Sequence, residues 1–312
     1  MTHGAGMVAA IAIAAMAVGA GEAQTPPAPG YRVVHGWPQL PEGRVLGSAA
    51  GVGVSGKGEV LVFHRGGRTW SEPLPLDPIR APTIAVFDAR TGRLLREWGA
   101  STFAMPHGLT VDTQGNVWTT DVALHQVFKF SPEGRLLMAL GERGVAGADA
   151  SHFNRPTDVA VLPDGAFYVS DGYRNTRVAK FSAEGRFLFQ WGRPGRGEGE
   201  FNTPHGLDVD AQGRVYVADR ENDRVQVFDA EGRFLRQIKD PAAGRPYGVA
   251  LLAGGGVAIA DGGEQPRSGP DRSALVIADG EGRVRERLGR FGNQDGQFRM
   301  AHDVAPAAAG AV

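Results

Sequence analysis

From about residue 48 onward, short segments of alternating apolar and polar residues recur along the chain, and similar turn residues separate them. One unit has such segments at 108–121, 126–130 and 132–137, and two related units start at Thr157 and Gly206. Alternation with a period of two predicts strands, and the Asp-Gly, Gln-Gly and Glu-Gly pairs between them predict tight antiparallel turns. A repeat of about 45 residues with four such strands is typical of a propeller blade.

The same pattern continues on both sides of these three units. An earlier unit runs from residue 52 to 95, with a longer excursion at 64–82. A fifth unit covers 248–288 and carries an insertion at 262–273. Repetition of one unit along the chain indicates a single closed domain rather than separate ones.

A sixth unit begins at Ala301 and then stops, because residues 306–312 contain no strand pattern. The sequence therefore predicts an all-β, six-bladed propeller over residues 45–312 whose sixth blade is incomplete. Residues 31–37 could supply one closing strand but not three. We accordingly expect a truncated or frameshifted chain with exposed strand edges.

Histidine occupies the same position in every second unit. The three motifs lie at nearly equal intervals, at Pro106-His107-Gly108, Pro204-His205-Gly206 and Ala301-His302-Asp303, and the intervening units lack the histidine. In a six-bladed ring, alternate positions lie ~120° apart around the axis. An isolated histidine is usually structural, but three converging imidazoles with an open fourth position suit catalytic Zn²⁺. Such an ion acts as a Lewis acid and lowers the pKa of a bound hydroxyl.

A second repeated position follows the second strand of each unit and opens a loop on the face where propellers usually bind ligands. Arg65 and Arg220 occupy equivalent places there and could bind a carboxylate through paired hydrogen bonds. The alternative is that both are rim arginines paired with acids such as Glu221. Tyr173, in the corresponding loop of another unit, could be a general base if a cation lowers its pKa, or an ordinary exposed tyrosine.

Asp303 follows His302 directly and should point to the opposite side of its strand. With the backbone carbonyls of Val52 and Leu109 it could hold a hard cation such as Ca²⁺, which prefers oxygen ligands.

Composition adds few further candidates. The chain has 312 residues, 42% hydrophobic and 21% charged, with a net charge of −1. This balance offers no basic stripe for nucleic acid or an anionic membrane surface. The absence of cysteine excludes a disulfide framework, a thiolate nucleophile and a Cys-ligated metal. Propellers are usually self-contained, so a monomer is expected.

The N-terminus carries an apolar run at residues 7–20, too short to span a bilayer comfortably, followed by small residues and a Pro-rich stretch. This pattern predicts a signal peptide at 1–23, then a linker and N-terminal segment at 24–44. The protein would then be secreted or periplasmic, with no membrane attachment after cleavage. No Lys or Arg precedes the apolar run, so an uncleaved anchor is the alternative.

Several segments together carry a resemblance to a known family: residues 63–70, 105–109, 120–130, 156–161, 169–175 and 217–222. Over roughly residues 45–305 the chain resembles peptidyl-α-hydroxyglycine α-amidating lyase, an NHL-repeat six-bladed propeller. The most specific parts are the three spaced histidine motifs and the run Asp-Val-Ala-Leu-His-Gln-Val-Phe-Lys at 121–129.

The resemblance implies a role for each candidate residue. It implies zinc binding by His107, His205 and His302; proton abstraction by Tyr173; substrate orientation by Arg65 and Arg220; lining of the site by Met300; and a structural calcium at Val52, Leu109 and Asp303. The implied substrate is a small molecule or peptide with an α-hydroxyglycine end, which is cleaved to an amide and glyoxylate. The alternative is a non-catalytic NHL-repeat propeller that binds a ligand or protein on its top face.

Overall fold

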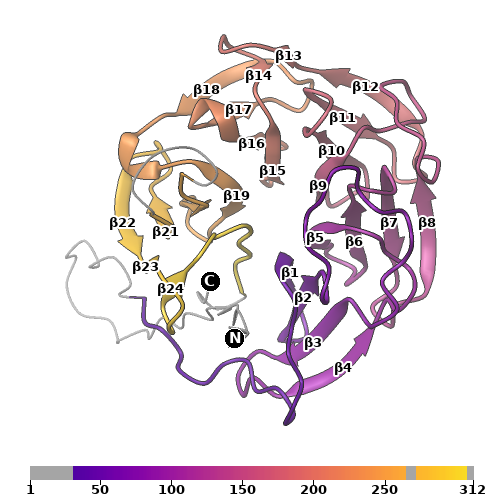
Figure 1. Cartoon of the computed structure of the whole chain (residues 1–312). Helices are drawn as coiled ribbons and strands as arrows, with labels where there is room; N and C mark the ends of the chain where they lie inside the picture. Colours follow the sequence, from indigo (N-terminus) through magenta and orange to yellow (C-terminus); the bar gives the residue numbers. More distant parts are fainter. Residues whose placement is uncertain (1–30, 265–271, 308–312) are drawn as a thin grey trace.

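The computed structural model describes residues 31–264 and 272–307, and the expected signal peptide lies outside them. Its main architecture is a set of five antiparallel four-stranded sheets, in which neighbouring strands are consecutive along the chain. Figure 1 shows these sheets as blades around a common centre, with β1, β5, β9, β15 and β19 innermost and β4, β8, β12, β18 and β22 outermost. Among the described residues, no helix is long and apolar enough to span a membrane.

The strand bounds follow the predicted repeat. The first blade consists of β1 (Ala49–Val54), β2 (Glu59–His64), β3 (Ile84–Asp88) and β4 (Leu94–Trp98). The second consists of β5 (Pro106–Val111), β6 (Val117–Asp121), β7 (Gln126–Phe130) and β8 (Leu136–Leu140). The third consists of β9 (Pro156–Val161), β10 (Phe167–Asp171), β11 (Arg177–Phe181) and β12 (Phe187–Trp191).

The last two complete blades have the same order. The fourth consists of β15 (Pro204–Val209), β16 (Val215–Asp219), β17 (Arg224–Phe228) and β18 (Phe234–Ile238). The fifth consists of β19 (Pro246–Leu251), β20 (Val257–Asp261), β21 (Ala274–Ala278) and β22 (Val284–Leu288). The remaining elements are two parallel pairs, β13 (Arg193–Pro194) with β14 (Glu200–Phe201) and β23 (Arg290–Phe291) with β24 (Gln297–Phe298), and two 3₁₀ turns, η1 (Arg220–Asn222) and η2 (Pro241–Ala243).

Hydrophobic packing between neighbouring blades forms the core. Between the first two blades, for example, the ring of Phe103 packs edge-on against Phe63 and Phe128, with centroids 4.7 and 5.6 Å apart. Inner and middle strands are nearly continuous buried runs, whereas outer strands such as β8 are largely exposed. The second, third and fourth blades are covered by a neighbouring blade on both faces, and their inner strands are held firmly around the axis.

In the second to fifth blades, an aspartate at the end of the second strand positions the inner strand of its own blade. The Asp121 carboxylate accepts hydrogen bonds from the backbone N–H groups of Ala104 and Met105, which precede β5. Equivalent bonds run from Asn154 to Asp171, from Asn202 to Asp219 and from Arg245 to Asp261. In these four blades, the segment that leads into the inner strand is therefore fixed by a buried, hydrogen-bonded carboxyl group.

The expectation of six blades is not confirmed. Within residues 31–264 and 272–307, no four-stranded sheet lies between β19 and β1, and residues 299–307 form no strand. The predicted closing strand at 31–37 is also wrong, because this segment forms no strand and the following Gln39 bridges to Arg93 beside β4. The physical reason is that residues 299–307 lack a run of alternating residues long enough to pair.

Residues 301–304 nevertheless take the innermost position next to the first blade. The Nδ1 atom of His302 lies 2.7 Å from the carbonyl oxygen of Ala50. The backbone N–H of Val52 donates to Asp303 Oδ2 over 2.8 Å, and the N–H of Ala301 donates to the Ser273 hydroxyl over 2.7 Å. This segment thus joins the fifth blade to the first at the axis.

Candidate metal centre and active site

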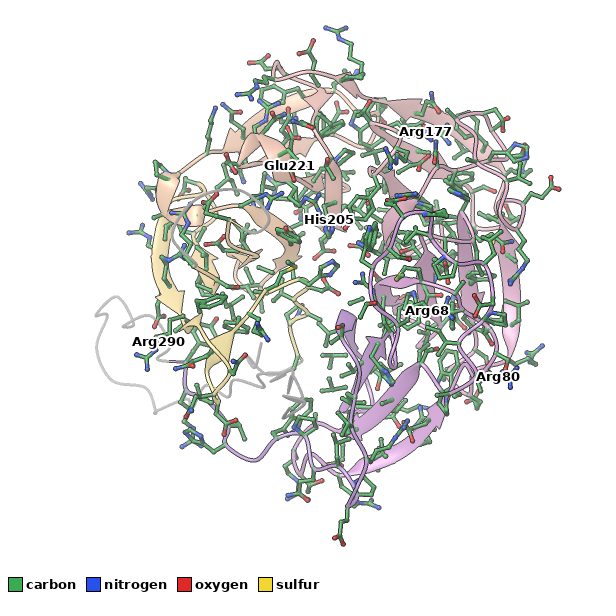
Figure 2. The ribbon with its side chains drawn as sticks, in the orientation of Figure 1. Arg68, Arg80, Arg177, His205, Glu221 and Arg290 are labelled. Atoms are coloured by element: carbon green, nitrogen blue, oxygen red, sulfur yellow. The ribbon has the colours of Figure 1, made fainter. Side chains whose placement is uncertain are left out.

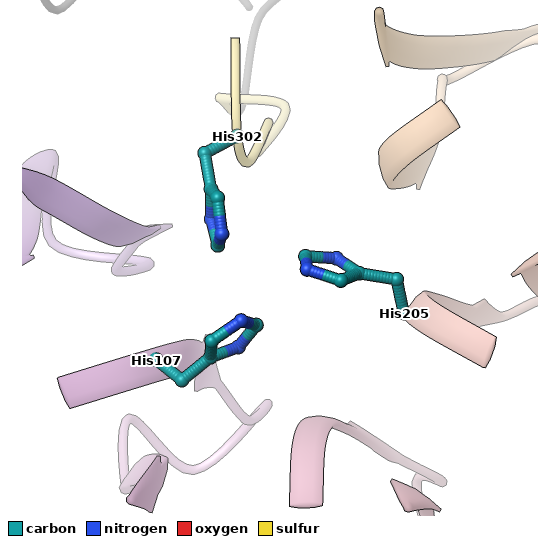
Figure 3. A group of neighbouring side chains, drawn as sticks. All are labelled: His107, His205 and His302. Atoms are coloured by element: carbon teal, nitrogen blue, oxygen red, sulfur yellow. The ribbon is translucent and has the colours of Figure 1, made fainter. Parts of the chain in front are cut away.

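Three histidines from distant parts of the chain meet at the axis of the propeller. His107 lies on β5, His205 on β15 and His302 in the segment after β24. One ring nitrogen of each lies within 4.8 Å of those of the other two. Figure 3 shows the three imidazoles directed at a common point, and Figure 2 shows His205 directed toward the centre of the ring. The structure therefore brings together the three residues that the repeat selected.

The other nitrogen of each imidazole is held by the backbone of the next blade. The Nδ1–O distance is 2.7 Å in all three cases, from His107 to Thr157, from His205 to Tyr247 and from His302 to Ala50. Because a carbonyl can only accept, Nδ1 carries the hydrogen, and the lone pair of Nε2 is left at the axis. A second ring nitrogen fixed by a carbonyl is the usual arrangement around metal-binding histidines.

Burial keeps the three imidazoles neutral. It lowers the pKa of His107 and of His205 well below the ordinary value, with smaller contributions from the neighbouring imidazoles and from Arg65 and Arg220. Burial, followed by the charge of Arg65, lowers the pKa of His302 to about 3. Neutral imidazole is the form that binds a metal ion, so the donor set fits Zn²⁺.

Tyr173 lies between two of the histidines and the guanidinium of Arg220. Its hydroxyl lies 3.0 Å from His107 Nε2 and 3.2 Å from His205 Nε2. The guanidinium of Arg220 donates to the same hydroxyl over 3.2 Å and lies 5.1 Å from the tyrosine ring centroid. A hydroxyl that could transfer a proton is thus in hydrogen-bond reach of two of the three axial Nε2 atoms.

The two arginines selected from the sequence both border this centre. Arg65 donates from Nε to the carbonyl of Pro106 over 3.0 Å, directly before His107. In the described part of the chain, no carboxylate forms a salt bridge with Arg65. Arg220 does pair with Glu221, at 2.9 Å, as the structural alternative predicted, but it contacts Tyr173 as well.

Carboxyl groups lie on the other side of the inner strands. Asp303 Oδ2 accepts from Val52, and Asp158 Oδ2 accepts from the N–H of Leu207 over 3.1 Å. Burial raises the pKa of Asp303 to about 7, and burial together with the charge of Asp303 raises that of Asp158 well above its usual range. Buried carboxyl groups whose ionisation is disfavoured by burial and by neighbouring carboxylates fit a hard cation such as Ca²⁺. The ligand roles of Val52, Leu109 and Asp303 stay predictions.

Sequence reasoning missed several residues around the centre. Asp158 occupies the same position in the third unit as Asp303 does in the sixth. Alignment of the repeats could therefore have identified it. Trp70, whose ring centroid lies 5.3 Å from that of Tyr173, had no such signal because it lies in the irregular excursion. Met300, expected to line the site, is 43% exposed, and its role stays a prediction.

Comparisons with known proteins agree with this fold. The NHL repeat family model matches residues 103–130, 153–181 and 201–228. A nidogen/laminin complex structure aligns with a TM-score of 0.59 at 14% identity, covering 82% of this chain and 84% of that one. A streptogramin B lyase structure aligns with a TM-score of 0.56 at 13% identity, covering 85% and 89%. At such low identity these structures show the fold alone.

Closer relatives are found among curated proteins. Peptidyl-glycine alpha-amidating monooxygenase of Mus musculus is 44% identical over 195 residues, which are 56% of this chain and 20% of the relative. A probable peptidyl-alpha-hydroxyglycine alpha-amidating lyase of Caenorhabditis elegans is 41% identical over 190 residues, 57% of this chain and 54% of the relative. Peptidyl-alpha-hydroxyglycine alpha-amidating lyase 1 of Drosophila melanogaster is 34% identical over 298 residues, 85% of this chain and 54% of the relative.

The fold and the axial centre define an NHL-repeat β-propeller with three converging histidines. Relatives at 34–41% identity bear the name peptidyl-α-hydroxyglycine α-amidating lyase, and the predicted resemblance to that family is confirmed. The chain spans about a fifth of the length of the monooxygenase and about half the length of the named lyases that it matches.

Proposed function

We propose that this protein is a zinc-dependent lyase that cleaves the C–N bond of an α-hydroxyglycine end and releases an amide and glyoxylate. The observation that carries the proposal is the position of the Tyr173 hydroxyl, within 3.2 Å of two histidine Nε2 atoms and of Arg220. A propeller that only binds a ligand has no need for this arrangement. The names of the relatives support the same reaction.

The three Nε2 atoms would hold the zinc ion, and the Tyr173 hydroxyl lies beside two of them. Bound there, zinc would supply Lewis-acid activation of the substrate hydroxyl. The residues of the chain would complete the reaction. The Tyr173 oxygen, which accepts from Arg220, takes the hydroxyl proton. The electron pair of that O–H bond forms the aldehyde C=O while the C–N bond breaks, and Tyr173 returns the proton to the amide nitrogen.

The arginines would orient the substrate. A substrate carboxylate next to the reacting carbon is a natural partner for Arg65 and Arg220, since guanidinium and carboxylate form paired, charge-assisted hydrogen bonds. Arg65 is mostly buried and has no carboxylate partner among the described residues, so substrate would provide one. Met300 would line the mouth of the site.

The remaining assignments concern stability and location. Calcium held by Asp303 with the carbonyls of Val52 and Leu109 would brace the inner strands below the zinc site. We further propose that the protein acts outside the cytoplasm as a monomer, consistent with the apolar run at residues 7–20 and the absence of cysteine.

Glyoxylate release from N-acetyl-α-hydroxyglycine by the zinc-loaded protein tests the proposal. We expect release by the wild type and a loss of about 10²- to 10⁴-fold in kcat for Tyr173→Phe, with zinc still bound. Tyr216→Phe, which alters a tyrosine buried between the fourth and fifth blades, is the matched control and should retain activity. Folded, zinc-loaded wild type that releases no glyoxylate would contradict the lyase proposal and favour a binding propeller.

A further inference from the structure

We propose that Trp70 forms the wall of a subsite for the side chain that precedes the hydroxyglycine, so that the site prefers an apolar or aromatic residue there. This inference rests on the proposed function, because it takes the reacting end of the substrate to lie at Tyr173. It concerns a residue outside the repeated blade positions.

The first observation is where Trp70 lies. Its ring is tilted against Tyr173, with centroids 5.3 Å apart, and the guanidinium of Arg65 lies 5.6 Å from its centroid. Trp70 thus touches both the expected base and one expected carboxylate ligand. Even so, 40% of the residue is exposed to solvent. An indole that is half covered by the site and half open is suited to bind a flat or apolar group.

The second observation is that the excursion carrying Trp70 is fixed in place. Glu72 accepts two hydrogen bonds from Arg155, of 2.7 and 2.8 Å, and also lies 3.6 Å from Arg174. Hydrogen bonding from Arg155, with a smaller contribution from Trp70 itself, lowers the pKa of Glu72 to about 2. Arg155 precedes β9 and Arg174 follows Tyr173, so the first blade's excursion is attached to the third blade.

Further contacts hold the rest of the excursion. The guanidinium of Arg143 donates to the carbonyl of Leu76 over 2.7 Å, and Arg68 forms a salt bridge of 2.9 Å with Asp77. Leu74 packs against the core cluster that Tyr173 also contacts. Trp70 is therefore presented by an anchored segment, and little conformational entropy needs to be lost when a substrate packs on it.

The direction of the substrate follows from its chemistry. The reacting carbon carries a hydroxyl, a carboxylate and the amide nitrogen. When the hydroxyl lies at Tyr173 and the carboxylate at Arg65 and Arg220, the amide and the preceding residue of the bound substrate must extend toward solvent. Trp70 borders Tyr173 and Arg65 on the exposed side, so the preceding side chain would pack on its ring.

Two pairs of ligands test the subsite. The reactive pair is N-acetyl-phenylalanyl- and N-acetyl-alanyl-α-hydroxyglycine, and the unreactive pair has glycine in place of hydroxyglycine. For the wild type we expect about a tenfold preference for phenylalanine, in KM for the reactive pair and in Kd by calorimetry for the unreactive pair. In Trp70→Ala, the alanine-to-phenylalanine ratio of KM and the corresponding ratio of Kd should both be close to one. Trp70→Phe should keep most of the preference.

The outcomes separate the subsite from the lyase activity. Leu137→Ala removes an apolar side chain of nearly the same exposure, 41%, on the outer strand β8 and should leave the ratios unchanged. Ratios near one in the wild type, or an unaltered preference in Trp70→Ala, would overturn the subsite. A phenylalanine preference in Kd that depends on Trp70, without any glyoxylate release, would support the subsite and contradict the lyase proposal.

Discussion

His302 Nδ1 lies 2.7 Å from the carbonyl oxygen of Ala50, although 252 positions separate the two residues along the chain. The bond repeats, at the junction between the two ends of the propeller, the contacts that His107 and His205 make with their neighbouring blades. The third histidine is therefore oriented by the first blade, and the described residues form no four-stranded sheet behind it. Its contribution to the proposed metal centre can be compared directly with that of the other two.

We predict that the wild type binds one Zn²⁺ per chain and that His107→Ala and His302→Ala each weaken its affinity about 100-fold or more, since each removes one of three ligands. Titration of the metal-free protein with zinc, followed by elemental analysis, measures this. His35→Ala is the control, because His35 is exposed and bonds only to Asp295 among the described residues. Wild-type zinc affinity in both ligand variants would rule out this centre.

The carboxyl groups beside the inner strands predict stabilisation by calcium. Calcium at about 100 times its Kd should raise the free energy of unfolding by about 2.7 kcal/mol. Asp303→Asn should remove most of this increase, because the amide is neutral and binds Ca²⁺ weakly. Thermal unfolding at fixed zinc, with and without added calcium, measures the effect.

Asp164→Asn serves as the control for this experiment, since Asp164 is an exposed turn residue whose carboxylate accepts from the N–H of Ala166. Its calcium response should equal that of the wild type. If added calcium did not change the thermal unfolding midpoint of the wild type, the proposal of a structural calcium at Asp303 would be wrong.

The blades and the histidine cluster could be predicted because both follow from a repeat. Alternation with a period of two is a local signal, and equivalent positions in a ring share one depth and radius. Hence Pro106, Pro156 and Pro204 all begin inner strands, and the histidines that follow two of them meet at the axis.

Contacts made by irregular segments could not be predicted in this way. The pairing of Glu72 with Arg155 joins residues 83 positions apart through an excursion that occurs in one blade only. The sixth blade was expected from a single motif at residue 301, but pairing needs alternating residues over several positions, and 299–307 form no strand. The family resemblance supplied residue roles, which geometry alone does not assign.

Glu221 provides a test of how Arg220 is oriented. Its carboxylate accepts from Arg220 Nε over 2.9 Å and forms a salt bridge with the buried Arg245 of the fifth blade. Glu221→Gln would weaken the charge-assisted bonds to both guanidiniums and allow Arg220 to leave Tyr173. We expect KM for N-acetyl-α-hydroxyglycine to rise about tenfold, with a smaller change in kcat, and stability to fall by about 1–3 kcal/mol.

Steady-state kinetics and urea unfolding measure these two effects. Glu231→Gln is the matched control, because the Glu231 carboxylate is exposed and accepts from Arg233, far from Arg220 and Arg245 in the repeat. If Glu221→Gln kept the wild-type KM, the interaction between Glu221 and Arg220 would have no part in binding the substrate.

His64 predicts a pH dependence of stability that is separate from the metal centre. The residue is buried at the end of β2, and its Nδ1 accepts from the N–H of Gly66 over 3.2 Å. Burial, followed by the charge of Arg44, lowers the pKa of His64 from 6.5 to about 4. The unfolded chain therefore binds a proton between these pH values that the native protein does not.

This residue should contribute full stability above about pH 6.5 and lose it progressively as the pH falls toward 4. Between pH 7.5 and 5, the loss from His64 amounts to about 2 kcal/mol. We expect His64→Gln, which cannot titrate, to lose correspondingly less stability than the wild type in urea unfolding at the two pH values. His35→Gln, which alters a side chain that is 76% exposed, should follow the wild type. If His64→Gln and the wild type lost the same free energy of unfolding between the two pH values, protonation of His64 would not be the cause of the loss.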